Sequence, residues 1–151
     1  MFFPINETDK HWCLGELAIK TGVITMYDSL FTYDDDEPPE EYIEKRIWWS
    51  NFRSVFTHQL PMYLVESEVM QLKNIDPNNY RVTFQYARDV PIQGGRYGDC
   101  GIWVCIFLYR LSHNLSLKVK NPVQTALAYR EYLAEFYWKY KIPIPRCSVL
   151  F

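Results

Sequence analysis

The chain has 151 residues, of which 48% are hydrophobic and 17% aromatic, so it is long enough for one compact domain and too apolar to be disordered. With 16 basic and 18 acidic side chains its net charge is −2, and we expect neither a nucleic-acid nor a membrane partner. No transmembrane or signal segment is recognisable, which favours reduced thiols inside the nucleus or cytoplasm at its four cysteines, Cys13, Cys100, Cys105 and Cys147.

Three strands are predicted at the start of the chain. Residues 2–6 favour a first strand, and residues 12–19 and 23–28 favour two more. A Thr-Gly turn at 21–22 joins the last two as an antiparallel hairpin. The hairpin brings together the beginning of one strand, at His11, and the end of the other, at Asp28.

Helices and one further strand are predicted in the middle of the chain. Residues 34–44 carry seven acidic and no basic side chains, which favours a solvated loop that opens a helix over 43–56. The alternative for this run is a docking surface for a basic partner. A separate helical segment is expected from Leu60-Pro61 to residue 72, followed by turns and by a strand over 80–87.

The last third of the chain predicts two helices. A loop at residues 91–99 contains three glycines and leads into a segment, 100–111, that is apolar on nearly every side. This pattern favours a buried central helix, with Trp103 and Cys105 in the core. Asn121-Pro122 predicts the start of a final helix that runs to about residue 140. The mixture of elements indicates an α+β fold.

Four residues have the chemistry of a thiol hydrolase. Cys100 lies where a glycine-rich loop becomes a helix, and free backbone N–H groups there stabilise a thiolate. His11 is a candidate base and Asp28 its orienter, while the Gln93 amide is a candidate donor to an oxyanion. Taken singly, each also has an ordinary alternative, such as a core cysteine or a turn aspartate.

The order of these residues carries a family resemblance. The chain reads His11-Trp12, then Asp28 within Tyr-Asp-Ser-Leu, then Gln93, and then Asp-Cys-Gly-Ile-Trp-Val-Cys around Cys100. This set resembles the ubiquitin-like-protein-specific (SUMO-type) cysteine proteases in a divergent, plant-like form. The resemblance implies a papain-like α+β fold with His11 as base, Asp28 as orienter, Gln93 as oxyanion donor and Cys100 as nucleophile. It also implies that Trp12 lines a substrate channel, with a core aromatic as the alternative.

The resemblance implies a monomeric peptidase or isopeptidase without a cofactor, which cleaves after the C-terminal Gly-Gly of a ubiquitin-like modifier such as SUMO. A zinc site at Cys100, Cys105 and His113 is not expected, because these residues lack paired ligand spacing. The alternative from another class is a catalytically silent, transposon-derived or truncated domain that binds a ubiquitin-like protein without cleaving it.

Two features differ from the family pattern. Residues 1–151 are expected to form a single catalytic domain that lacks the helical part which usually precedes the His-Trp strand. We therefore expect a marginally stable chain with exposed apolar surface and weak activity. Gln93 lies one position further from Cys100 than is common in the family, and we expect a bulge among the loop glycines to absorb the extra residue.

Overall fold

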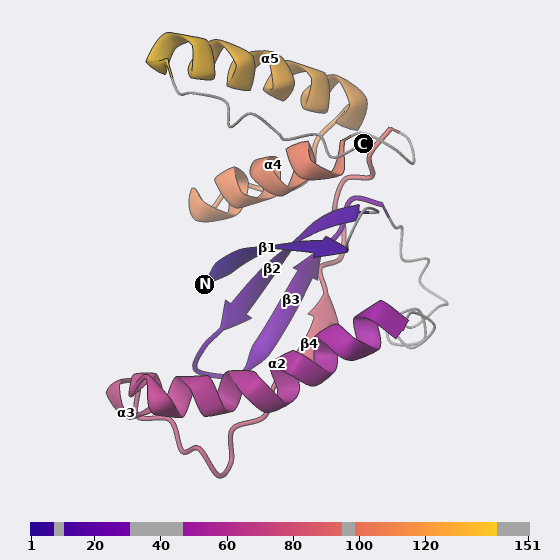
Figure 1. Ribbon diagram of the computed structural model, residues 1–151. Helices are drawn as coiled ribbons and strands as arrows, with labels where there is room; N and C mark the ends of the chain where they lie inside the picture. Colours follow the sequence, from indigo (N-terminus) through magenta and orange to yellow (C-terminus); the bar gives the residue numbers. More distant parts are fainter. Residues whose placement is uncertain (8–10, 31–46, 95–98, 142–151) are drawn as a thin grey trace, which may run out of the picture.

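The structure of the chain is a computed structural model that describes residues 1–7, 11–30, 47–94 and 99–141 (Figure 1). Its elements follow in the order β1 (Phe2–Glu7), β2 (His11–Ala18), β3 (Val23–Tyr27), α2 (Ile47–Glu66), α3 (Val69–Leu72), β4 (Thr83–Tyr86), α4 (Cys100–Ser112) and α5 (Pro122–Tyr140). The strands form one sheet in the order β1-β2-β3-β4, in which β4 is parallel to β3 and the other pairs are antiparallel. The predicted α+β class is confirmed.

β2 and β3 form the predicted hairpin, and its turn explains the glycine in the sequence. Ala18 pairs with Val23, and the Gly22 N–H donates to the Ala18 carbonyl at 2.9 Å. The φ of Gly22 is +74°, and a Cβ atom there would lie 2.2 Å from the Arg81 carbonyl oxygen. Only glycine fits such a turn. Its register brings the start of β2 close to the end of β3.

Alternating side chains of the strands build two apolar clusters, one on each face of the sheet. In Figure 1, α2 and α3 lie on one side of the sheet, and α4 with α5 on the other. The α2-side core consists of Ile5, Cys13, Leu17, Ile24, Met26, Trp49, Leu64, Met70, Tyr80 and Val82. The α4-side core consists of Leu14, Tyr27, Trp103, Val104, Ile106, Phe107 and Ala126. Packing of α4 on β2 fixes the N-terminus of α4 relative to the hairpin.

The prediction of a separate helix from residue 60 is wrong, because α2 continues through Pro61 to Glu66 and only the short α3 follows. A proline inside a helix removes one backbone hydrogen bond. Apolar side chains at helical spacing on both sides of Pro61 nevertheless pack against the α2-side core: Trp49, Phe52, Phe56, Leu60 and Leu64. Their burial favours one continuous helix. The acidic run at 34–44 and the predicted start of this helix lie outside the described residues.

α4 begins at the predicted residue, but it is not buried on every side. Trp103 is fully buried as predicted, whereas Cys105 is exposed and the prediction that it belongs to the core is wrong. Leu108 and Tyr109 are also exposed. β2 and α5 each cover one side of the helix, and no other described element packs extensively against it. Apolar composition therefore overestimated the burial of this helix.

α5 has the predicted start, and most of its surface is exposed. The Asn121 side chain accepts a hydrogen bond from the Gln124 N–H at 3.2 Å, and Pro122 is the first helical residue. Ala126 is the one fully buried residue of the helix.

β4, at 83–86, is shorter than the predicted strand. Within the described ranges, no helix has the length and apolar content that a membrane span requires.

Candidate active site

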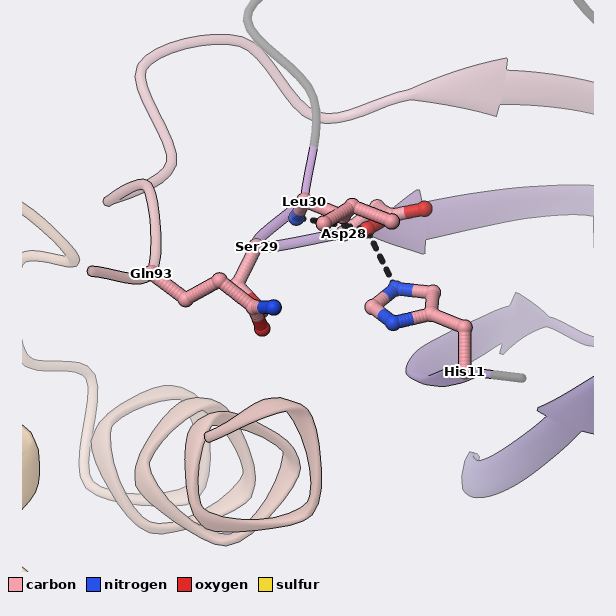
Figure 2. Close-up of polar contacts among 5 residues, drawn as sticks. All are labelled: His11, Asp28, Ser29, Leu30 and Gln93. Atoms are coloured by element: carbon pink, nitrogen blue, oxygen red, sulfur yellow. Dashed lines mark hydrogen bonds and ion pairs between the residues drawn. The ribbon is translucent and has the colours of Figure 1, made fainter. Parts of the chain in front are cut away.

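A buried histidine–aspartate pair lies at the end of the two central strands, where β2 begins and β3 ends. Nε2 of His11 and Oδ1 of Asp28 are 2.7 Å apart, and the two residues are 5% and 1% exposed (Figure 2). Oδ1 also accepts a hydrogen bond from the Leu30 N–H at 2.9 Å. Because Nε2 is directed at the carboxylate, Nδ1 is the ring nitrogen left to exchange a proton with a thiol. The predicted meeting of His11 and Asp28 is confirmed, and their roles as base and orienter stay predictions.

Cys100 is the first residue of α4 and is partly exposed. The N–H groups in the first turn of a helix have no partner within the helix, and together with the helix dipole they stabilise a negative charge. Since α4 packs on β2, the thiol is carried on the helix that lies against the strand of His11. This is the setting that a nucleophilic thiolate needs.

The thiol of Cys13 interacts electrostatically both with Asp28 of the His11–Asp28 pair and with Cys100. It lies on β2, two residues after His11, and burial raises the pKa of its thiol well above the usual value, with smaller contributions from Asp28, Glu7 and Cys100. Cys13 is therefore close enough to both Asp28 and Cys100 to interact with their charges. The same shift keeps Cys13 protonated, so it does not compete as a nucleophile.

Gln93 is fixed to the residue that follows Asp28. The Ser29 hydroxyl donates to Oε1 of Gln93 at 3.0 Å, and the Gln93 backbone N–H donates to the Ser29 carbonyl at 2.7 Å. Both side chains are buried, and Figure 2 shows them side by side near His11. With Oε1 bonded to Ser29, the Nε2 end of the amide carries the donors that an oxyanion needs. Part of the loop between Gln93 and Cys100, residues 95–98, lies outside the described residues, so the predicted bulge stays a prediction.

Trp12, next to His11, is 40% exposed. The alternative that it is a core aromatic is therefore wrong. An exposed indole beside the base is available to contact a ligand, and its assignment to a substrate channel stays a prediction.

The other two histidines lie away from this group. His113 is at the C-terminal end of α4, opposite to Cys100, where its Nδ1 lies 2.8 Å from the Tyr109 carbonyl oxygen. His58 is on α2, with Nδ1 2.8 Å from the Ser54 carbonyl oxygen. Cys100 and His113 thus lie at opposite ends of α4. Among the described residues, no group of three or more His, Cys, Asp and Glu side chains is arranged to hold a metal ion.

One functional contact was missed by the sequence analysis. Ser29 was part of the quoted motif but received no role, and it is one of the most buried polar residues, at 1% exposure. A hydroxyl residue directly after a candidate aspartate at a strand end is a signal that could have found it. Its partner, 64 residues away, was not predictable from local pattern.

Comparisons with known proteins agree with this geometry. The chain matches the family model of the Ulp1 protease family, C-terminal catalytic domain, over residues 1–138. Its structure is similar to that of the C-terminal Ulp1 protease domain in complex with Smt3, the yeast ortholog of SUMO, with a TM-score of 0.55 and 23% identity over 91% of this chain and 51% of that chain. It is also similar to the SUMO protease Ulp1 with its catalytic cysteine oxidised to a sulfonic acid, with a TM-score of 0.57 and 22% identity over 94% of this chain and 54% of that chain. No curated protein sequence matches the chain.

The structural similarity shows a shared fold, and the chain spans about half the length of the Ulp1 structures that it matches. The family match, by contrast, covers nearly the whole chain, from residue 1 to residue 138. The mixed helices and sheet of the fold are those expected of that match. The chain therefore belongs to the Ulp1 protease family of cysteine proteases.

Proposed function

We propose that this domain is a thiol peptidase that cleaves after the C-terminal Gly-Gly of a ubiquitin-like modifier such as SUMO, from a precursor or from a conjugated amine. The observation that carries the proposal is the buried His11–Asp28 pair on the hairpin against which the Cys100 helix packs. A similar protein, the Ulp1 protease domain, has been solved in complex with Smt3, and this supports a modifier of the same class as the substrate.

The first half of the reaction is acylation. Nδ1 of His11 takes the proton of the Cys100 thiol, and Asp28 stabilises the imidazolium through Nε2. The thiolate attacks the carbonyl carbon of the last glycine, so that a C–S bond forms and the carbonyl oxygen becomes negative. The Gln93 amide and the Cys100 backbone N–H donate hydrogen bonds to this oxygen. His11 then gives its proton to the leaving amine as the C–N bond breaks.

The second half is hydrolysis of the thioester. His11 takes a proton from water, the hydroxide oxygen attacks the acyl carbon, and the C–S bond breaks. The modifier leaves with a free carboxylate, and the Cys100 thiol regains its proton. We expect the exposed Trp12 to line the path of the modifier's tail, where glycines without side chains are admitted in preference to bulkier termini.

A second candidate function is binding of a ubiquitin-like protein without cleavage. The observation in its favour is the exposed apolar surface of α5, where Leu127 is 51% and Trp138 86% exposed. Exposed apolar side chains of this kind are typical of interaction surfaces. This candidate predicts binding that does not depend on Cys100.

The two candidates are separated by a SUMO-type modifier that ends in a thiol-reactive vinyl ester in place of the last carboxylate. The peptidase proposal expects a covalent adduct that is lost in Cys100→Ser and in His11→Ala. Cys105→Ser is the matched control, because Cys105 is an exposed thiol on the same helix, and its adduct must form as in the wild type. Binding of the unmodified modifier without any adduct supports the silent domain, and an adduct that survives Cys100→Ser overturns the proposed nucleophile.

A further inference from the structure

An ion pair joins α5 to the residue that precedes Cys100. Nε and NH2 of Arg130 donate hydrogen bonds to Oδ1 of Asp99, at 3.0 and 2.7 Å. Two N–H groups of one guanidinium therefore converge on a single carboxylate oxygen, which holds that oxygen on the side facing α5. The side chains are 45% and 24% exposed, so the pair is only partly screened by solvent.

Asp99 occupies the N-cap of α4 without capping the helix. Its side chain accepts no hydrogen bond from the first turn, whereas Asn121, at the N-cap of α5, accepts one from the Gln124 N–H. Aspartate is among the best N-cap residues, so the absence of a cap bond here needs a cause. Two features supply it: the backbone of Asp99 is helical, at φ −111° and ψ −3°, and not extended as at Asn121, and the bonds from Arg130 hold Oδ1 toward α5.

This placement matters for the charge around the nucleophile. A carboxylate beside a thiol disfavours the thiolate, and a capping carboxylate would occupy N–H groups of the turn from which the Cys100 N–H is to donate to an oxyanion. Among the residues that the structure describes, the charged or titratable groups of this region are Glu7 on β1, His11 and Cys13 on β2, Asp28 after β3, Asp99 beside Cys100 and Arg130 on α5. Arg130 is the permanent positive charge in this set.

We propose that Arg130 is a positioning residue for the reactive thiol: it holds Asp99 away from the first turn of α4 and offsets its charge. The thiolate, and the oxyanion formed after it, then meet free N–H groups in place of a carboxylate. The proposal rests on the proposed function in that it takes Cys100 as the nucleophile.

The test is the pH dependence of Cys100 alkylation by iodoacetamide, followed residue by residue with mass spectrometry on the full chain. Arg130→Met is expected to move the midpoint of the pH–rate curve upward and to slow alkylation at neutral pH by about threefold to tenfold. Asp99→Asn is expected to move the midpoint downward, and in the double variant most of the effect of Arg130→Met disappears. Arg130→Lys keeps the positive charge but not the two parallel N–H donors of the guanidinium, and it is expected to slow alkylation less than Arg130→Met does.

The matched control is Lys118→Met, which removes another exposed ion pair, between Lys118 and Asp89 at 3.3 Å, and must leave the Cys100 curve unchanged. If Arg130→Met lowers the melting temperature but leaves the curve in place, the ion pair is only structural and the proposal is wrong. Should Arg130→Met fail to fold, an unshifted curve for Asp99→Asn overturns the proposal equally. Because iodoacetamide needs no modifier, a missing adduct with the SUMO-type probe refutes the proposed function without affecting this result.

Discussion

The same strands build two regions that are filled in different ways: the apolar core on the α2 side, and the end of the sheet where β2 begins and β3 ends. On the α2 side, aromatic rings pack on one another, with Phe52 and Phe56 at 4.5 Å and Trp49 and Phe52 at 5.4 Å between centroids. At the end of the sheet where β2 begins and β3 ends, by contrast, buried polar residues bond in pairs, His11 with Asp28 and Ser29 with Gln93.

The apolar core contributes to the stability of the fold, whereas the buried polar group contains the candidate catalytic residues. Burial of apolar rings stabilises the fold without directional demands, whereas a buried polar group is costly unless each partner is present. Four of the five buried polar residues in the described structure belong to this one group. Two consecutive residues after β3 organise it, because Asp28 bonds to His11 and Ser29 bonds to the Gln93 amide. We expect substitutions in the buried polar group to change rate, and those in the α2-side core to change stability.

The largest expected effect is on turnover. Cys100→Ser and His11→Ala should each abolish cleavage of a Gly-Gly-linked substrate, while Asp28→Asn should leave a remnant after a loss of roughly 10⁴-fold, because an orienter does not handle the transferred proton. Steady-state assays beside melting curves measure both properties. Wild-type turnover by either of the first two variants would refute the assigned roles.

On the α2 side, Trp49→Ala should lower the free energy of unfolding by about 3–5 kcal/mol, since a buried ring leaves a cavity. Denaturant unfolding measures the change. Trp12→Ala is the matched control: its exposed indole should contribute little to stability but, as a channel residue, should raise KM for the modifier. Equal destabilisation by the two variants would contradict the assignment of stability to the α2-side core.

Gln93→Ala should reduce kcat by about 10²–10³-fold if its amide faces the oxyanion. Single-turnover acylation rates measure the loss, with binding of the modifier as the control that should stay constant. A loss smaller than about tenfold would show that the longer loop has turned the amide away from the site.

Ser29→Ala removes the hydrogen bond to Oε1 of Gln93 and should reduce kcat by about tenfold, the equivalent of one ordinary buried hydrogen bond. KM should stay near the wild-type value, because the Gln93 amide is still present and only loses the hydrogen bond that orients it. Ser29→Thr keeps the hydroxyl and should recover most of the rate. In the Gln93→Ala background, Ser29→Ala should have little further effect on kcat, and full additivity would contradict the coupling.

The smallest expected effect is on alkaline stability. Burial raises the pKa of Cys13 above its ordinary value of 9.0, so the folded state keeps the thiol protonated while the unfolded state ionises. The stability contributed by the neutral thiol is therefore complete below pH 9 and declines above it, by about 1.4 kcal/mol per pH unit. Urea unfolding between pH 8 and 10 measures the slope, and Cys13→Ala should flatten it. An unchanged slope would show that Cys13 ionises freely in the folded protein.

The local pattern of the sequence determined the hairpin, the start of α4 and the start of α5. Alternation of apolar residues, the turn at Gly22 and the Asn121-Pro122 cap act over a few residues, so they need no knowledge of the rest of the chain. The pairing of His11 with Asp28 was predictable for the same reason, since the register of a two-stranded hairpin fixes which ends meet.

Only the tertiary structure decided the contacts between distant segments. Pro61 stays inside α2 because apolar side chains before and after it pack against the α2-side core. Cys105 is exposed because the packing partners of α4, and not its composition, decide which of its residues are buried. The bonds from Ser29 to Gln93 and from Arg130 to Asp99 join residues 64 and 31 positions apart. Such contacts form only when separate elements pack at a particular distance and angle, and the free energy that fixes this arrangement comes from the burial of many side chains together.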